Sequence, residues 1–203
     1  MQTQTKETLA AMTPDKALAL LKEGNQRFVN GQAEERQLMQ QMTETSEGQY
    51  PFAVVLGCVD SRVPPELVFD LGIGDIFGVR IAGNFVNEDI LGSMEFATKV
   101  VGSKLILVMG HTSCGAIQGA MDDVELGNLT GLVGKLKPAV AAYRSSSGEE
   151  NRSGINEIAK LNVEMTIEDI KKRSPVLKEL VDNGEIAIAG AMYDVASGKV
   201  DFL

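Results

Sequence analysis

The sequence contains no tryptophan, and aromatic residues make up only 5% of its 203 residues. So few aromatic side chains argue against a base-stacking surface for single-stranded nucleic acid. The net charge of −9 argues further against nucleic acid or an anionic membrane as the main partner. No stretch approaches the roughly 20 apolar residues of a membrane span. We therefore expect no nucleic-acid partner and no membrane partner.

Cysteine and histidine are also scarce, since the chain has two cysteines, Cys58 and Cys114, and one histidine, His111. A secreted protein held together by disulfides uses more cysteines, although two can still form one bridge. The first residues, MQTQTKETLAAMTPDKA, contain no apolar run after a basic start. We therefore expect no secretory signal in this sequence and a cytoplasmic protein.

The length suits one compact domain over residues 1–203, in which residues 1–48 form an N-terminal helical arm and connector. Within this arm, Thr13 and Pro14 are typical of a helix start. An apolar stripe over residues 17–28 continues the helix. The polar segment that follows is rich in Gln and Glu and predicts a connector with some helix.

Short apolar runs alternate with amphipathic segments in the rest of the sequence, which is typical of an α/β domain. Strands are predicted at residues 52–56, 76–81, 105–109 and 186–191, with an edge strand at 200–203. Helices are predicted at 89–101, 116–121, 126–144, 156–173 and 175–181, with a loop at 145–148. We expect a mainly parallel central sheet of four strands plus an edge strand, flanked by helices. Ligands bind beyond the carboxyl ends of such strands.

All of the soft metal ligands lie in two short clusters, CVDSR at residues 58–62 and HTSC at 111–114. Each cluster follows a predicted strand and is preceded by glycine. Two thiolates, an imidazole and a carboxylate can form a tetrahedral shell, and sulfur with nitrogen favours zinc over magnesium or calcium. Gly115 should let backbone approach closely beside Cys114. The pattern predicts a zinc site, the alternative being two small apolar cysteines in the core.

The sequence resembles the β-class carbonic anhydrases closely over roughly residues 49–119, and the segments GCVDSRVPPE, GDIFGVRIAGN and GHTSCGAIQGA carry the resemblance. The resemblance implies one zinc ion per chain, bound by Cys58, His111 and Cys114. It also implies the reversible hydration of carbon dioxide to bicarbonate and a proton, by attack of zinc-bound hydroxide. Zinc supplies that hydroxide near neutral pH because it lowers the pKa of water.

The resemblance further implies a catalytic dyad of Asp60 and Arg62. Asp60 lies two residues beyond Cys58 and is near enough in sequence to be a further ligand of the same metal, at the position that water needs. Arg62 competes for Asp60, because a guanidinium binds a carboxylate through two parallel hydrogen bonds. We expect Asp60 to be a gate controlled by Arg62, the alternative being a salt bridge that only shapes the loop.

The substrate pocket is also assigned by resemblance. Gln49, nine positions before the first cysteine, is similar to a glutamine that contacts bicarbonate. Phe77 matches an apolar residue that lines the carbon dioxide pocket, and Phe96 lies where some members have tyrosine. Gly115, next to the last metal ligand, completes this set. The alternatives are core packing for the two phenylalanines and a solvated loop position for Gln49.

The helix in the N-terminal arm resembles the segment that packs on a neighbouring subunit in this family. The resemblance implies a homodimer or a dimer of dimers, the alternative being that the helix packs on its own domain. Some relatives bind an inhibitory bicarbonate with tryptophan, arginine and tyrosine. Arg80 and Tyr193 match two of these positions, whereas the tryptophan position is Val55. We therefore expect weak or absent inhibition by bicarbonate.

Three other functions are compatible with parts of this pattern. The same zinc shell could act on carbon disulfide or carbonyl sulfide, as relatives of this fold do. A zinc-stabilised binding module would need a fourth permanent ligand, which Asp60 could supply. Arg62 argues against that module because it can draw Asp60 off the metal. A thiol redox protein is disfavoured because the sequence has no CxxC motif.

Overall fold

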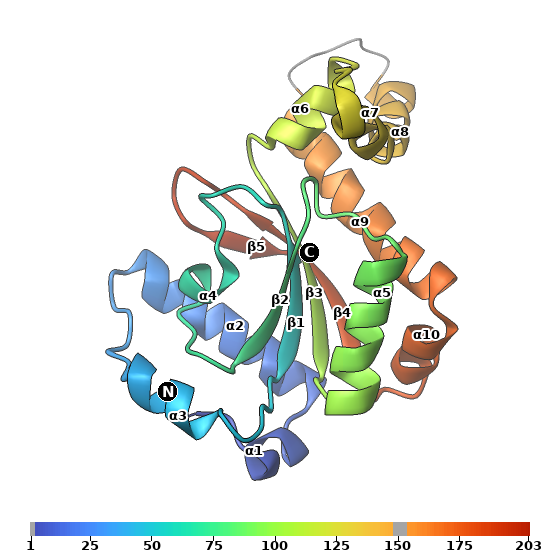
Figure 1. The fold of residues 1–203 in the computed structure, drawn as a ribbon. Coiled ribbons are helices and arrows are strands. Elements are labelled where there is room, and N and C mark those ends of the chain that lie inside the picture. The colour runs from blue at the N-terminus through green and yellow to red at the C-terminus, as the bar shows by residue number, and fades with distance from the viewer. Residues whose placement is uncertain (1–2, 148–153) are drawn as a thin grey trace.

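The computed structural model describes residues 3–147 and 154–203. Within these ranges the strands form a five-stranded sheet in the order β2-β1-β3-β4-β5. The strands are β1 (Ala53–Gly57), β2 (Ile76–Arg80), β3 (Leu105–His111), β4 (Ala187–Tyr193) and β5 (Val200–Phe202). The strands β1 to β4 are parallel to one another, and β5 is antiparallel to β4. The predicted α/β fold, with a mainly parallel sheet and an edge strand, is confirmed (Figure 1).

Helices flank this sheet along most of the described chain. They are α1 (Lys6–Ala10), α2 (Pro14–Val29), α3 (Leu38–Glu44), α4 (Pro65–Val68), α5 (Glu88–Glu95), the π-helical turn η1 (Phe96–Val101), α6 (Gly115–Met121), α7 (Gly127–Gly134), α8 (Lys137–Ser147), α9 (Ile155–Arg173) and α10 (Pro175–Asp182). None of the described helices is both long enough and apolar enough to cross a membrane.

Side-chain caps explain where several of these helices begin. The Thr13 side chain accepts a hydrogen bond from the Lys16 backbone N–H, and Pro14 occupies the first helical position of α2, as predicted. Asn87 caps α5 in the same way, by accepting from the backbone N–H of Ile90. Such caps satisfy backbone donors that have no partner inside the helix.

The helix predicted at residues 126–144 is in fact two helices, α7 and α8. The chain turns between them at Leu136, whose side chain is fully buried. The loop predicted at 145–148 is wrong for residues 145–147, because α8 continues to Ser147. Within α8, the hydroxyls of Ser145 and Ser146 donate to preceding carbonyls of the helix. Gly148 lies outside the described residues.

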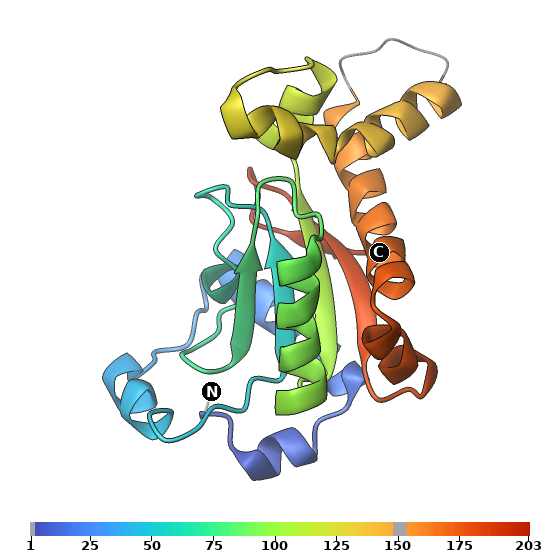
Figure 2. The ribbon, with the colours of Figure 1, turned by 45° about the vertical axis from the view of Figure 1, so that its right-hand side comes forward.

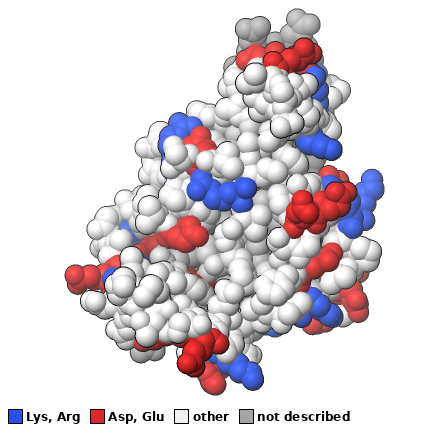
Figure 3. All heavy atoms as spheres, viewed as in Figure 1, with Lys and Arg blue, Asp and Glu red and all other residues white. Residues whose placement is uncertain are grey.

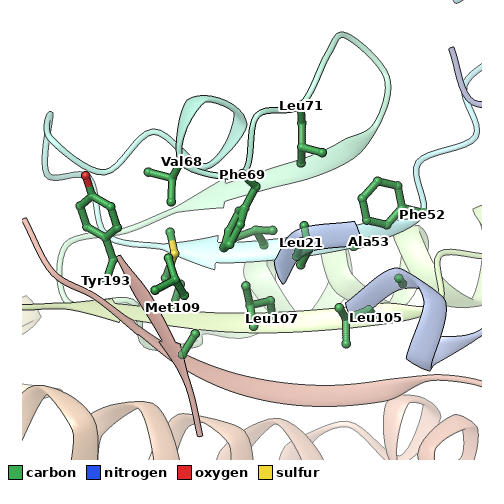
Figure 4. Close-up of a cluster of buried hydrophobic side chains, with 14 of the residues drawn as sticks. Leu21, Phe52, Ala53, Val68, Phe69, Leu71, Leu105, Leu107, Met109 and Tyr193 are labelled. Atoms are coloured by element: carbon green, nitrogen blue, oxygen red, sulfur yellow. The ribbon is translucent and has the colours of Figure 1, made fainter. Parts of the chain in front are cut away.

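Two apolar clusters cover the two faces of the sheet. Ala53 and Val55 of β1 point to one face, where Leu21 of α2 packs against them (Figure 4). Val54 and Leu56 point to the other face, which α5, α9 and α10 cover (Figure 2). Side chains alternate along a strand, so burial of both faces explains why β1 and β3 are almost entirely apolar.

A third apolar cluster lies beyond the carboxyl ends of the strands, where α6, α7 and α8 extend the molecule (Figure 1). It contains Cys58 and Cys114, together with Leu136 from the turn between α7 and α8 and Ile158 from α9. The two cysteines therefore lie where the sheet meets this group of helices. That edge of the sheet is where ligands bind in open α/β folds.

Candidate metal centre

Three soft ligands converge at the carboxyl ends of β1 and β3. Cys58 directly follows β1, His111 is the last residue of β3, and Cys114 immediately precedes α6. Since β1 and β3 are neighbouring parallel strands, their carboxyl ends lie at the same edge of the sheet. The ligand atoms of the three residues all lie within 4.8 Å of one another, and all three residues are buried. The predicted zinc-ligand cluster is thus assembled in the structure.

The backbone fixes the His111 ring in the form that a metal needs. His111 Nδ1 lies 2.9 Å from the Thr112 carbonyl oxygen, which can only accept a hydrogen bond. Nδ1 therefore carries the proton, and Nε2 keeps a free lone pair. Nε2 is buried and has no hydrogen-bond partner among the described residues. A buried polar atom without a partner costs free energy, and a metal ion would satisfy it.

Gly110, just before His111, allows α9 and β4 to pack closely against the end of β3. A Cβ added at Gly110 would lie 2.8 Å from Val163 Cγ2 and 2.8 Å from Met192 Sδ. Only glycine therefore lets α9 and β4 approach the end of β3 this closely. The glycine before His111, which marks the end of the strand in the sequence, has this packing role.

The Cys58 sulfur receives a backbone donor from the turn that follows β2. The Gly83 N–H donates to Cys58 Sγ at a distance of 3.4 Å. Gly83 has a φ of 79° and is followed by Asn84 with a φ of 40°, so this turn uses a left-handed backbone that suits glycine and asparagine. The Asn162 side chain in α9 donates to the Gly83 carbonyl at 2.8 Å and holds the turn in place.

The two thiols influence each other's ionisation. Contact with Cys114 lowers the pKa of the Cys58 thiol to about 4, and the same contact, together with burial, raises the pKa of Cys114. Without a metal, the pair thus holds one proton between two buried sulfurs. A divalent cation can replace that proton and neutralise two thiolates, which is the usual chemistry of a zinc–cysteine site.

Asp60 and Arg62 form a bidentate pair beside the three ligands. Arg62 Nε donates to Asp60 Oδ1 at 2.9 Å, and Nη2 donates to Oδ2 at 2.7 Å. The Arg62 backbone N–H also donates to Oδ1. Hydrogen bonds from Arg62 hold the pKa of Asp60 well below its usual range. Asp60 Oδ2 remains 3.9 Å from His111 Nε2, so the carboxylate lies next to the cluster while Arg62 binds it.

Arg80 contacts the loop that carries these groups. Its Nε donates to the Cys58 carbonyl at 2.9 Å, and its Nη2 donates to the Asp60 carbonyl at 2.6 Å. Tyr193 ends β4 opposite His111, and its ring is largely buried. Its carbonyl accepts a hydrogen bond from the Thr112 N–H. The resemblance placed Arg80 and Tyr193 in a bicarbonate pocket, whereas here Arg80 contacts the first metal-binding loop and Tyr193 contacts the second.

The structure does not bring the other predicted substrate residues to this cluster within one chain. Gln49 precedes β1, whereas Cys58 follows it, so the two lie at opposite ends of the strand. Phe77 is paired with Val54 near the start of β1. Its ring packs edge-on against Phe96, with centroids 6.2 Å apart, and both line a shallow groove beside α5.

Gly115 begins α6 directly after Cys114. We expected this glycine to permit a close backbone approach, but that explanation is wrong. A Cβ added there would have nothing within 4 Å among the described residues. Gly115 therefore faces open space beside the metal ligands, and its role toward a substrate stays a prediction.

Several residues that shape the centre were missed in the sequence analysis. They are Gly83 and Asn162 around Cys58, and Thr112, which fixes the His111 ring. Arg80 was named only as a match to a bicarbonate-binding position, and its contact with the backbone of the first cluster was missed. The Gly-Asn pair at 83–84 was a turn signal that could have been found. The contacts of Asn162 and Arg80 cross between distant segments and leave no local signal.

Comparison with known proteins agrees with this geometry. The family model described as carbonic anhydrase matches residues 53–200. Carbonic anhydrase 2 of Mycobacterium tuberculosis is 36% identical over 192 residues, covering 92% of this chain and 91% of the relative. The carbonic anhydrase of Mycolicibacterium smegmatis is also 36% identical, over 194 residues, covering 93% and 92%.

The fold is similar to that of solved β-carbonic anhydrases. One of two tetrameric enzymes from Sordaria macrospora superposes with a TM-score of 0.75 at 25% identity, covering 92% of this chain and 95% of that one. The family match spans both metal-binding clusters, the four strands β1 to β4 and the first residue of β5. The Cys58–His111–Cys114 cluster is typical of the zinc site in these enzymes. The chain belongs to the β-class carbonic anhydrase family.

Proposed function

We propose that this carbonic anhydrase uses Asp60 and Arg62 as its catalytic dyad, beside one zinc ion bound by Cys58, His111 and Cys114. The observation that carries the proposal is the pairing of Asp60 with Arg62 at 2.7 and 2.9 Å. With Asp60 so engaged, Cys58, His111 and Cys114 would hold zinc with three protein ligands, and a catalytic rather than a structural zinc has three. Zinc held there activates water for attack on carbon dioxide.

Asp60 has a defined task in this arrangement. Arg62 keeps the pKa of the carboxyl low, so Asp60 is ionised and can only accept hydrogen bonds. An oxygen nucleophile next to His111 Nε2 would donate a hydrogen bond to Asp60, which lies 3.9 Å from that nitrogen. That hydrogen bond directs a lone pair of the nucleophile toward the carbon of carbon dioxide. The products are bicarbonate and a proton that leaves for solvent.

Arg62 acts on Asp60 rather than on the substrate. A carboxylate this near the cluster could turn onto the metal and fill the open position. Two parallel hydrogen bonds from one guanidinium oppose that movement, because both must break before Asp60 can leave. A third contact, from Arg62 Nη2 to the Ser113 carbonyl at 3.4 Å, links the two metal-binding loops. We therefore infer that Arg62 holds the gate open.

We also propose that Gln49, Phe77 and Phe96 serve the active site of a second copy of the chain. Phe77 pairs with Val54, which precedes Cys58 by four residues. At 3.3 Å per residue, Phe77 therefore lies about 13 Å from the level of Cys58 along the strand. In their own chain they are too far from the cluster to bind its substrate.

The surface around Phe77 and Phe96 suits contact with a second copy. Phe96 is 50% exposed, and β2 is an edge strand with no strand on its outer side among the described residues. Figure 3 shows a largely uncharged area in the middle of this face. The Sordaria macrospora enzymes are tetrameric by their published description. A homodimer, or a dimer of such dimers, would bury this surface and complete both sites.

Other parts of the proposal concern the setting of the enzyme. We infer that residues 1–203 work as one β-carbonic anhydrase domain. We place it in the cytoplasm, because two buried thiols whose ligand atoms lie within 4.8 Å stay reduced there before zinc binds. We expect weak or absent inhibition by bicarbonate, because the Arg80 donors Nε and Nη2 bind the loop carbonyls of Cys58 and Asp60.

A stopped-flow assay of carbon dioxide hydration tests this function. The zinc-loaded protein should accelerate hydration, and Asp60→Asn should keep its zinc while losing most of the acceleration. Asp182→Asn, at an exposed carboxylate that pairs with Lys178 on α10, is the control and should keep most of it. A zinc-loaded protein that does not hydrate carbon dioxide would support the zinc-stabilised binding module instead.

A further inference from the structure

One residue between the metal ligands has an unusual backbone conformation. Ser113 lies between His111 and Cys114 and has a φ of 55°, in the left-handed region. Residues other than glycine, asparagine and aspartate rarely adopt this conformation, because their Cβ crowds the backbone. The sequence does not supply glycine here, so contacts from elsewhere in the fold must hold Ser113 in place.

The main contact comes from α9, which is distant in the sequence. The Ser113 backbone N–H donates to the side-chain oxygen Oδ1 of Asn156 at 2.9 Å. On the other side, the Ser113 carbonyl accepts from Arg62 Nη2 at 3.4 Å, which is a long hydrogen bond. Asn156 therefore provides the stronger of the two contacts that hold this turn.

Asn156 belongs to a part of α9 that is packed against neighbouring helices. It is the second residue of α9, and the following residues Ile158 and Ala159 are buried among the helices above the sheet. Asparagine is a poor helix former inside a helix. Gly154, which precedes the helix, has no side chain that could cap it. The Asn156 oxygen does not cap the helix either, but accepts the hydrogen bond from Ser113. The contact thus connects a rigid helix to the turn that carries Cys114.

We propose that Asn156 is a positioning residue for the zinc site: by accepting the Ser113 N–H, it holds the left-handed turn that directs Cys114 toward Cys58 and His111. The proposal rests on the proposed zinc site. Loss of the acceptor leaves Ser113 free to return to an ordinary conformation, which moves the Cys114 sulfur away from the other ligands. Zinc then leaves more readily, although no residue that binds it has changed.

The test measures zinc release from the loaded holoenzyme to an excess of a chromogenic chelator. Asn156→Ala should release zinc about tenfold faster than the unmodified protein, the scale typical of groups that orient metal ligands. Asn156→Asp keeps an acceptor oxygen and should release zinc at nearly the original rate. Glu157→Ala, at the next exposed position of α9, is the matched control and should leave the rate unchanged.

The double variant Asn156→Ala with Ser113→Gly separates positioning from general stability. Glycine adopts the left-handed conformation without strain, so it should recover most of the lost zinc retention. The proposal is overturned if Asn156→Ala releases zinc at the control rate, or if the double variant releases it as fast as Asn156→Ala alone. If the unmodified protein binds no zinc, the proposed zinc site fails as well.

A measurement on the unmodified protein covers the case in which Asn156→Ala does not fold. The Ser113 amide belongs to an exposed residue, so slow hydrogen exchange at this amide requires its bond to Asn156. We expect exchange clearly slower than that of an unbonded surface amide. Exchange as fast as that of an unbonded amide would contradict the proposal.

Discussion

Asp60 binds Arg62 through two parallel hydrogen bonds, while its Oδ2 lies only 3.9 Å from His111 Nε2. A carboxylate oxygen on zinc would lie at about 2.0–2.2 Å from the metal. Once released by Arg62, the Asp60 carboxylate would therefore be within reach of a metal held by His111. The partner of Asp60 decides whether the metal keeps an open position.

Removal of Arg62 should let Asp60 block the open position on the metal, without loss of the metal itself. In Arg62→Ala, Asp60 loses its bidentate partner, so it should turn onto zinc and lower hydration activity by about 10- to 100-fold. Zinc content should stay near that of the unmodified protein. Arg144→Ala is a suitable control, because the hydrogen bond of Arg144 within the described part of the chain goes to the Met121 carbonyl, away from the ligands. Near-normal turnover of zinc-loaded Arg62→Ala would show that Asp60 is not a gate.

Asp60 itself should not titrate in the range where the enzyme works. Hydrogen bonds from Arg62 lower its pKa in the folded state below the unfolded value of about 3.9. The stabilising effect of the ionised pair is therefore fully present above that value and is lost only as the pH falls below it. Carbon NMR of the Asp60 carboxyl should show a constant chemical shift above about pH 5. A midpoint near neutral pH would contradict this assignment.

A buried ion cluster should make Asp70 important for stability. Its side chain is 3% exposed and binds Arg27 and Arg36, and the Arg36 side chain is only 8% exposed. Asp70→Ala leaves the buried Arg36 charge facing the more distant Glu34 carboxylate at 3.8 Å, which should lower the free energy of unfolding by about 3–5 kcal/mol. Urea denaturation measures this loss. Exposed Glu35→Ala should change stability by less than about 0.5 kcal/mol, and equal effects of the two variants would contradict the prediction.

The exposed ring of Phe96 should be needed for assembly. The unmodified protein should sediment without a monomer at micromolar concentration. Phe96→Glu places a charge in the proposed subunit contact and should produce monomers that keep zinc but lose activity. Leu126→Glu changes another exposed apolar side chain, directly before α7, and should leave the assembly intact. An active monomer of the unmodified protein would argue against a site shared between subunits.

The sequence predicted the sheet well because its strands have a strong local signal. Continuous apolar runs ending at Gly57-Cys58 and Gly110-His111 marked both the strands and the edge where the ligands meet. The short helices α1 and α4 were missed, because four or five residues contain too little periodicity. The break at Leu136 was also missed, although Gly134 at the end of α7 and Pro138 in the first turn of α8 are signals of a helix end and a helix start.

The candidate site was predicted in part for similar reasons. Its metal ligands are rare residue types in two compact motifs, so composition and spacing identified them. Contacts such as Asn162 to Gly83 and Asn156 to Ser113 join segments far apart in the chain, and one sequence gives no sign of them. The distance of Gln49 from Cys58 could have been inferred from the sequence, because the strand predicted at 52–56 already separates them.

A zinc titration of metal-free protein tests the central claim most directly. Protein stripped by a chelator should have no hydration activity, and activity should rise in proportion to added zinc until about one ion per chain is bound. Cys58→Ser and His111→Ala should neither bind zinc tightly nor recover activity. Full hydration activity in the stripped protein, or in a variant that binds no zinc, would contradict the assignment of Cys58, His111 and Cys114 as the ligands of a catalytic metal.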